Sequence, residues 1–240
     1  MFNISFSTIF SKTTTKTKRE HEKITVIDAR ETAPLASTAH MFRDASDKTK
    51  GGLSVAVPGE IKGYWQAHQL FGKLPWNRLF QPAIEMCTNG FHLPASQARF
   101  VKYCETKILS SVELRECYFN SIKNELYKAN AVLRRPKLAK TFEVLAREGA
   151  DAFYNGSLTD TIVHEIQTNG GIITRHDLQS YECLVKEPIS YMLKNGVLLN
   201  TVPSPSCGTL LNFILALLDC ECFFNYSNIL SDFSIFSKEQ

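Results

Sequence analysis

The chain has 240 residues, of which 44% are hydrophobic and 21% charged, a composition typical of an ordered globular protein rather than a disordered one. Its 27 Lys and Arg side chains exceed its 24 Asp and Glu side chains, which gives a formal net charge of +3. Because the basic residues are distributed among the acidic ones, the charge pattern argues against a nucleic-acid-binding surface, and we predict no nucleic-acid partner.

The first elements in chain order are predicted to form a β-hairpin. Apolar residues recur with a period of two from Phe2 to Phe10, and a second apolar stretch follows a polar interval. We therefore predict strands near residues 2–10 and 23–29. The interval contains the basic sequence KTTTKTKREHEK, which we interpret as a solvated turn rather than a binding patch.

The next segment is predicted to contain a strand and two helices. A strand near 53–57 is expected to end at Pro58-Gly59, and a helix near 60–71 follows it. We place His68 on the surface of that helix rather than in a catalytic site. A second helix is expected near 75–89, where Pro82 should kink or split it.

The second half of the chain alternates helical and β-type patterns. Residues 94–130 are helical by composition but irregular, and we assign no chemistry to them. The remaining expected elements are helices near 137–148, 158–168 and 206–218 and strands near 183–192 and 196–201. Because no internal repeat or linker divides the chain, we predict one α+β domain.

The usual metal and catalytic motifs are missing from the sequence. Seven cysteines occur with no CxxC pair, and the six histidines show no HxxxH or HExxH spacing. GxSxG, GxGxxG and P-loop motifs are also missing. We therefore predict no metal site and no cofactor. The odd cysteine count argues against a complete disulfide framework, although it leaves room for one bridge.

Cys207 and Arg30 each have two interpretations on the residues alone. Cys207, in PSPSCGT, is either a nucleophile at a strand-to-helix turn or a small residue at the start of a helix, and we favour the second. Arg30, in TVIDARETAP, either forms a surface ion pair with Asp28 or Glu31 or offers its guanidinium to a carboxylate ligand. The ten residues of this stretch favour the surface pair.

Three Asn-X-Ser triplets are candidate N-glycosylation sites if the chain enters the secretory route: Asn3, Asn155 and Asn225. Asn155 is expected to be the most accessible of them, just before a helix. No signal peptide or membrane anchor is visible, because the N-terminal residues alternate and the longest apolar run, 213–224, is interrupted by two acids.

Several blocks together resemble the γ-glutamyltransferase (glutathione hydrolase) family, and they occur in the family's order. The blocks are VIDARETAP, GGLSVAVPGEIKGYWQAHQLFGKLPWNRLFQPAIEMCTNGF, LAREGADAFYNGSLTDTIVHEIQTNGGIITRHDLQSY and VPSPSCGTLLNFILALL. The similarity covers roughly residues 2–218. On this basis we assign 1–218 to a partial large-subunit domain and 219–240 to a divergent tail.

The resemblance implies part of the αββα sandwich of N-terminal-nucleophile hydrolases, incomplete in this chain. It also implies an enzyme in which an N-terminal threonine attacks the γ-glutamyl amide of glutathione and the acyl group passes to water or an amino acid or peptide. In the family, the arginine of the AREVAP-like block holds the substrate α-carboxylate, and this residue matches Arg30. With the resemblance included, we favour this second interpretation of Arg30. The implied location is the extracellular face of the plasma membrane.

The sequence also departs from the family pattern. We find no threonine-initiated GGTAHLS-like block and no downstream acidic or Ser-Ser segments, and Cys207 stands where the family has a small residue. Cys117 falls where relatives carry a nearby bridge, without its expected partner. We therefore expect a fragment that lacks catalytic residues of its own, needs a small-subunit segment, and is inactive alone. The alternative is a non-catalytic truncated isoform that acts at most as a binding protein.

Overall fold

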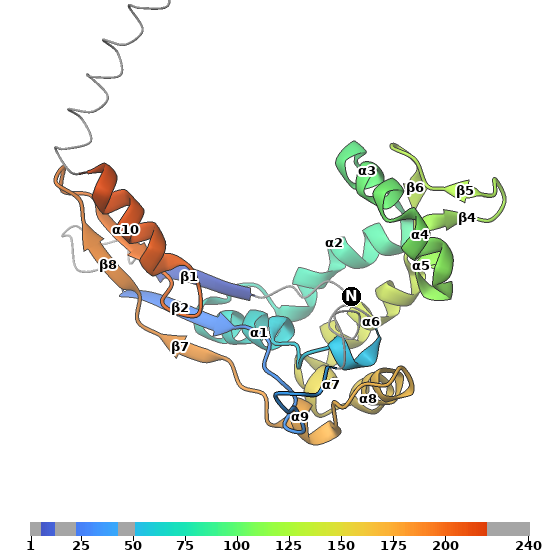
Figure 1. Ribbon diagram of the computed structural model, residues 1–240, viewed down its shortest axis with the longest axis horizontal. Helices are drawn as coiled ribbons and strands as arrows, with labels where there is room; N and C mark the ends of the chain where they lie inside the picture. The colour runs from blue at the N-terminus through green and yellow to red at the C-terminus, as the bar shows by residue number, and fades with distance from the viewer. Residues whose placement is uncertain (1–5, 13–22, 43–50, 220–240) are drawn as a thin grey trace, which may run out of the picture. The chain divides into compact units, whose positions relative to one another are not determined.

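The computed structural model describes residues 6–12, 23–42 and 51–219, which fall into two compact units (Figure 1). The first unit comprises the described residues up to Phe71 together with 171–173 and 180–219. The second unit comprises 72–170 and 174–179. The described residues are mixed helix and strand, as the α+β prediction requires.

A three-stranded antiparallel sheet organises the first unit. Its order is β1 (Phe6–Lys12), β2 (Lys23–Ala29) and β7 (Leu184–Lys186). β1 pairs with β2 from Phe6 opposite Ala29 to Lys12 opposite Lys23, which confirms the hairpin. The basic turn predicted inside this hairpin lies outside the described residues. β2 is the central strand, and its Val26 and Ile27 side chains are completely buried.

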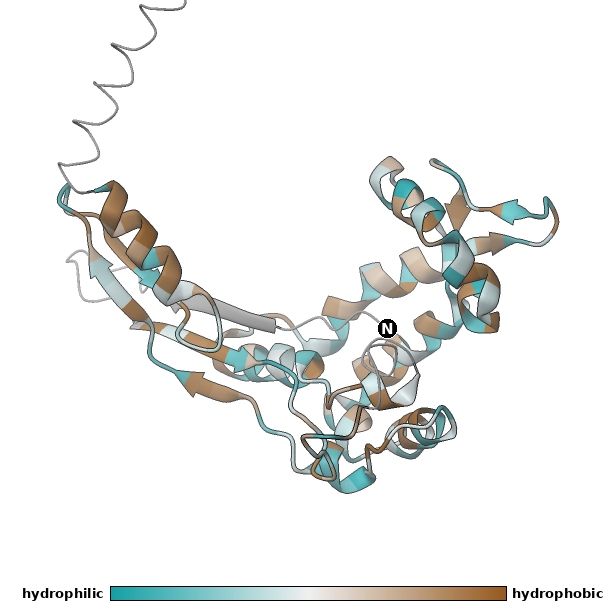
Figure 2. Cartoon of the chain, in the orientation of Figure 1, coloured by the Kyte–Doolittle hydropathy of each residue, from teal (hydrophilic) through white to brown (hydrophobic). Residues whose placement is uncertain are grey.

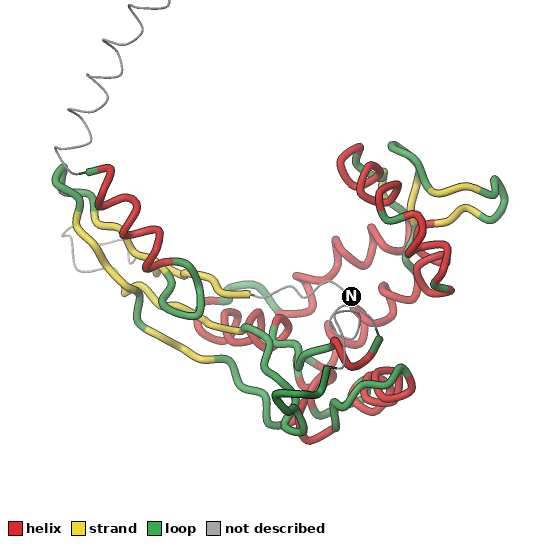
Figure 3. Tube along the Cα trace, in the orientation of Figure 1, coloured by secondary structure: helices red, strands yellow, loops and turns green. Residues whose placement is uncertain are grey.

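Helices pack on both β-structures of the first unit. α1 (Glu60–Phe71) contacts β1 and β2, whereas α10 (Gly208–Leu218) contacts the antiparallel hairpin of β8 (Ile189–Met192) and β9 (Leu198–Thr201). Figure 3 traces these helices and strands along the chain. The helices predicted near 60–71 and 206–218 and the strand near 196–201 are thereby confirmed.

Two strand predictions in this unit need correction. Residues 53–57 form no strand: a 3₁₀ turn, η1 (Gly52–Ser54), is followed by one isolated bridge between Val57 and Thr32. The strand expected near 183–192 is two strands, β7 and β8. Pro188 lies between them, and because proline has no N–H to donate to a ladder, it ends one pairing before the next begins.

Two long helices form the centre of the second unit. α2 (Trp76–Asn89) packs along α6 (Pro136–Glu148), and the Trp76 indole N–H donates to the Leu145 carbonyl at 2.8 Å. The Phe80 ring lies 5.0 Å from the Trp76 ring and 6.0 Å from that of Phe142. Pro82 lies inside an unbroken α2, so the helix is not split. We attribute its continuity to this packing, which offsets the hydrogen bond that proline cannot make.

Shorter elements complete the second unit. Residues 94–130, expected to be helical but irregular, form short helices and a short hairpin, and the helix expected near 158–168 is α8. The elements are β3 (Phe91–His92), α3 (Ala95–Tyr103), α4 (Glu105–Ser110), α5 (Val112–Tyr118), β4 (Phe119–Asn120), β5 (Glu125–Leu126), β6 (Val132–Leu133), α7 (Asp151–Tyr154), α8 (Thr159–Thr168) and α9 (Arg175–Gln179). No helix within the described residues is long and apolar enough to cross a membrane.

Candidate functional site

Arg30 lies directly after β2, and its backbone is held from two sides. Its N–H donates to the Asp28 carboxylate at 3.2 Å, and its carbonyl accepts a 2.8 Å hydrogen bond from the Tyr181 hydroxyl. Two residues further on, Thr32 and Val57 exchange backbone hydrogen bonds of 3.2 and 2.9 Å. The end of the central strand is therefore fixed, and with it the point from which the Arg30 side chain projects.

The Asp28 carboxylate is occupied by groups other than the Arg30 guanidinium. The Asp28 side chain is only 7% exposed, and Lys186 Nζ, from the neighbouring strand β7, lies 2.7 Å from its second oxygen. Lys186 Nζ also donates to the Ser204 carbonyl at 3.2 Å. A nearly buried carboxylate is costly unless paired, and this strand-to-strand ion pair meets that requirement.

The Arg30 guanidinium forms no hydrogen bond or ion pair with any residue in the described part of the chain. The surface pair with Asp28 or Glu31 that the local sequence favoured is therefore not formed. Arg30 and Glu31 are both half-buried, and one Glu31 carboxylate oxygen is buried without a hydrogen-bond partner among the described residues. The strand end thus carries two groups without a hydrogen-bond partner among the described residues: the Arg30 guanidinium and one carboxylate oxygen of Glu31.

Tyr181, like Lys186, is a residue of this site that the sequence did not predict. It is 4% exposed, and burial raises the pKa of its hydroxyl, with the charges of Cys183, Asp28 and Glu31 acting in the same direction. The hydroxyl therefore stays protonated and remains a donor. Gly59 makes room for it, because a Cβ there would lie 1.9 Å from the Tyr181 hydroxyl oxygen and 2.3 Å from the Ala29 carbonyl oxygen.

Cys207 lies at the N-cap of α10, as the helix-start interpretation expected, and its side chain is exposed. The next residue, Gly208, allows the close approach that begins the helix, since a Cβ there would lie 2.0 Å from the Val202 carbonyl oxygen. The five cysteines within the described residues are unpaired: Cys87, Cys104, Cys117, Cys183 and Cys207. Burial raises the pKa of the Cys183 thiol, so this thiol is not activated.

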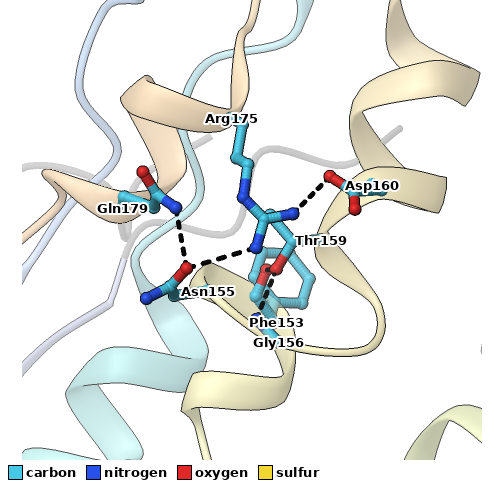
Figure 4. Close-up of polar contacts among 7 residues, drawn as sticks. All are labelled: Phe153, Asn155, Gly156, Thr159, Asp160, Arg175 and Gln179. Carbon is cyan, nitrogen blue, oxygen red and sulfur yellow. Dashed lines mark hydrogen bonds and ion pairs between the residues drawn. The ribbon is translucent and has the colours of Figure 1, made fainter.

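Asn155 is exposed in the second unit and belongs to a polar cluster (Figure 4). Its side-chain oxygen accepts hydrogen bonds from Arg175 at 3.2 Å and from Gln179 at 2.7 Å, and Arg175 is also ion-paired with Asp160. Below it, the Thr159 hydroxyl accepts from the Gly156 N–H at 2.8 Å. The other two candidate glycosylation sites, Asn3 and Asn225, lie outside the described residues.

Comparison with known proteins identifies the class and then the family. In solved structures, the fold matches gamma-glutamyltranspeptidase of Helicobacter pylori at a TM-score of 0.77 and 25% identity, over 86% of this chain and 58% of that one. The enzyme of Pseudomonas nitroreducens, solved with L-DON, matches at a TM-score of 0.71 and 30% identity, over 86% of this chain and 59% of that one. The fold is therefore part of the N-terminal-nucleophile hydrolase sandwich.

Two sequence relatives and a family model identify the family to which the chain belongs. Glutathione hydrolase 2 of Arabidopsis thaliana is 41% identical over 80% of this chain, and Scoloptoxin SSD14 of Scolopendra dehaani is 40% identical over 81%. These matches cover 33% and 34% of the relatives, so the chain spans about a third of their length. The model of the gamma-glutamyltranspeptidase family matches residues 13–232. The chain belongs to the gamma-glutamyltranspeptidase family, and the predicted family is confirmed.

Proposed function

We propose that this chain supplies the large-subunit part of a site that cleaves γ-glutamyl amides, with Arg30 holding the α-carboxylate of the donor. One observation carries the assignment. Lys186 and the Arg30 backbone N–H occupy the Asp28 carboxylate, and the Arg30 guanidinium remains available at a strand end with a fixed backbone. A guanidinium binds a carboxylate through two parallel N–H donors, which sets position as well as affinity.

In this proposal Arg30 positions the substrate and does not react. Fixing the α-carboxylate places the γ-carbonyl for attack by a threonine on a small-subunit segment, which forms the acyl-enzyme and later releases it to water or an amino-acid acceptor. The donors are glutathione and other γ-glutamyl compounds. No threonine-initiated block of the family type occurs in the 240 residues, so the completing segment is a required partner.

The polypeptide of these 240 residues alone is therefore expected to be inactive. We predict no release of the aniline product from a γ-glutamyl anilide, with or without glycylglycine as acceptor. The nucleophile and oxyanion donors account for most of the barrier lowering in acyl transfer, and Arg30 replaces neither. Turnover by the pure chain would contradict the proposal, and its loss on treatment with a thiol reagent would indicate a cysteine nucleophile, with the exposed Cys207 as the first candidate.

The complementary experiment measures the activity of the chain after it has been joined to the upstream and downstream segments of a full-length relative. This protein should be active. Arg30→Lys should raise KM for the donor about tenfold or more, because a point charge replaces the two-donor fork. The control is Arg78→Lys, since Arg78 is exposed on α2 and remote in sequence from the strand end. An Arg30→Lys enzyme with unchanged KM would show that Arg30 has another role.

The proposed location is the extracellular face of the plasma membrane, which requires passage through the secretory route. Asn155 is exposed, and its side-chain nitrogen is the group that would carry a glycan. We expect Asn155 to be occupied in secreted material. Peptide mapping that finds Asn155 bare and Asn225 occupied would reverse the ranking of these sites. A non-catalytic isoform is the alternative, and a transcript that does not encode the threonine block would support it.

A further inference from the structure

A groove in the second unit has no part in the proposed donor site. It is formed by α3, α4 and α5 together with the β4–β5 hairpin and the residues that follow it, and its volume is about 1260 Å³. Pockets for small ligands usually measure roughly 300–1000 Å³, so the groove has room for a longer, extended ligand. Apolar side chains in its lining include Leu109, Phe119 and Leu126.

The charges that line the groove are not balanced. Its two glutamates are already paired with lysines of the same lining: Glu105 lies 2.6 Å from Lys102, and Glu125 is paired with Lys128. The two remaining charged side chains are Arg99 and Arg115, so the groove keeps a net positive charge. Such a charge favours an anionic ligand.

Neither arginine is committed to an acid within the part of the chain that the structure describes. The guanidinium carbon of Arg115 lies over the Phe119 ring, 5.3 Å from its centre, a cation–π contact that uses no acidic partner. Arg99 is exposed on α3. Together they offer two carboxylate-binding forks beside an apolar floor.

Large apolar side chains on the elements that form the groove are also exposed to solvent. Tyr103, at the end of α3, is 86% exposed, and Ile122, in the turn of the β4–β5 hairpin, is 96% exposed. Leu109 and Phe100 are 43% and 46% exposed. Exposed apolar side chains on the elements that form a groove favour a peptide, which can pack on them, over a free small anion.

We propose that this groove binds an extended acidic peptide segment of a partner protein. Carboxylates of the peptide pair with Arg99 and Arg115, and its apolar side chains pack on Leu109, Phe119 and Leu126. Both glutamates of the lining are paired with lysines, so no unpaired acidic group of the lining opposes such a ligand.

The test uses the full 240-residue chain and two fluorescein-labelled peptides, EFEELF and its uncharged counterpart QFQQLF, with anisotropy measured at 150 mM NaCl. EFEELF should bind saturably in the micromolar range, and QFQQLF at least about tenfold more weakly, because charge-assisted hydrogen bonds are lost. Arg99→Gln combined with Arg115→Gln should weaken EFEELF binding about tenfold or more. Lys73→Gln combined with Arg78→Gln removes the same charge from exposed positions outside the groove and should change binding less than about twofold.

A steric variant keeps the test independent of charge. Ala98→Phe fills part of the groove and should also weaken EFEELF binding, with an unchanged circular dichroism spectrum confirming that the variant is folded. Equal losses in the groove and control double variants would overturn the proposal by showing general electrostatic attraction. Absence of saturable binding up to 1 mM peptide would also overturn it, as would binding to vesicles of phosphatidylserine in place of EFEELF.

Discussion

At the scale of single residues, the Arg30 backbone depends on Tyr181, a side chain 151 positions later in the chain. Tyr181→Phe removes the hydroxyl and leaves a partly buried carbonyl without its donor, so we expect the free energy of unfolding to fall by about 1 kcal/mol. Urea denaturation measures this loss. Tyr64→Phe is the matched control, because the Tyr64 hydroxyl donates at the surface to Glu60, and its loss should cost less.

Gly59 tests the same contact from the other side. Gly59→Ala places a Cβ against the Tyr181 hydroxyl and the Ala29 carbonyl, and we expect a loss of about 3 kcal/mol because the backbone cannot yield freely. Gly170→Ala is not a suitable control, because Gly170 has a positive φ that alanine disfavours. The control is therefore Ser110→Ala, a substitution at an exposed position. A Gly59→Ala chain as stable as its parent would show that Tyr181 does not hold the strand end in this way.

The Glu148 carboxylate gives a residue-scale prediction about pH. Ser157 donates to Glu148 at 2.5 Å and Arg147 lies 2.6 Å away, and these contacts, with the Ser157 hydrogen bond first, lower the pKa of Glu148. A lowered carboxyl pKa adds stability above the group's ordinary pKa, and this stability is lost as pH falls through the folded-state value.

Removing the Ser157 hydroxyl should therefore raise the pKa of Glu148 toward its ordinary value. Carboxyl-carbon NMR titration of Ser157→Ala measures the shift, and Ser157→Thr keeps the hydroxyl and serves as control. A pKa of Glu148 that is the same in Ser157→Ala and in the parent would mean that Ser157 does not bond to the carboxylate in solution.

At the scale of elements, α10 is built mainly from apolar residues (Figure 2), and several of their side chains are exposed. Leu210, Phe213 and Leu217 are 57%, 59% and 46% exposed, and they recur at intervals of three and four residues on the helix. Exposed apolar area of this kind drives association. We expect the chain to self-associate at micromolar concentration and the triple variant Leu210→Lys, Phe213→Glu, Leu217→Lys to shift it toward monomer.

Sedimentation velocity distinguishes these outcomes. A control with apolar exchanges, Leu210→Met and Phe213→Leu, should associate like the parent, because the exposed apolar area is kept. A parent chain that sediments only as a monomer would show that the exposed apolar residues of α10 do not cause self-association.

Elements with a strong local pattern could be predicted from the sequence, and those set by distant contacts could not. β2 and α6 follow from their own periodicity and stop signals, such as Gly149 with its positive φ of 78° after α6. Residues 53–57 have a strand-like composition, yet only Val57 forms a β-bridge. Its partner is Thr32, which lies outside any strand, so the pairing does not extend into a ladder. Local sequence does not contain that information.

The candidate site divides in the same way. Arg30 could be selected from its position after an apolar strand and from the family resemblance. Tyr181 and Lys186 could not, because they reach the strand end through the pairing of β2 with β7, a contact between segments more than 150 residues apart. The local sequence favoured an ion pair between Arg30 and an acidic neighbour. This prediction was wrong, because Lys186 forms the ion pair with the Asp28 carboxylate.

At the scale of the whole molecule, we propose that Arg30 recognises the α-carboxylate of the donor. The direct measurement compares two anilides in the completed, active protein: the γ-glutamyl anilide and the 4-aminobutyryl anilide, which differs only by lacking the α-carboxylate. Loss of charge-assisted hydrogen bonds worth about 1.5–3 kcal/mol corresponds to roughly 10- to 100-fold. Arg30→Ala should therefore lower kcat/KM by about that factor for the γ-glutamyl anilide and leave the poor 4-aminobutyryl anilide nearly unaffected. Equal losses of kcat/KM for both anilides, or no loss for either, would contradict this role of Arg30.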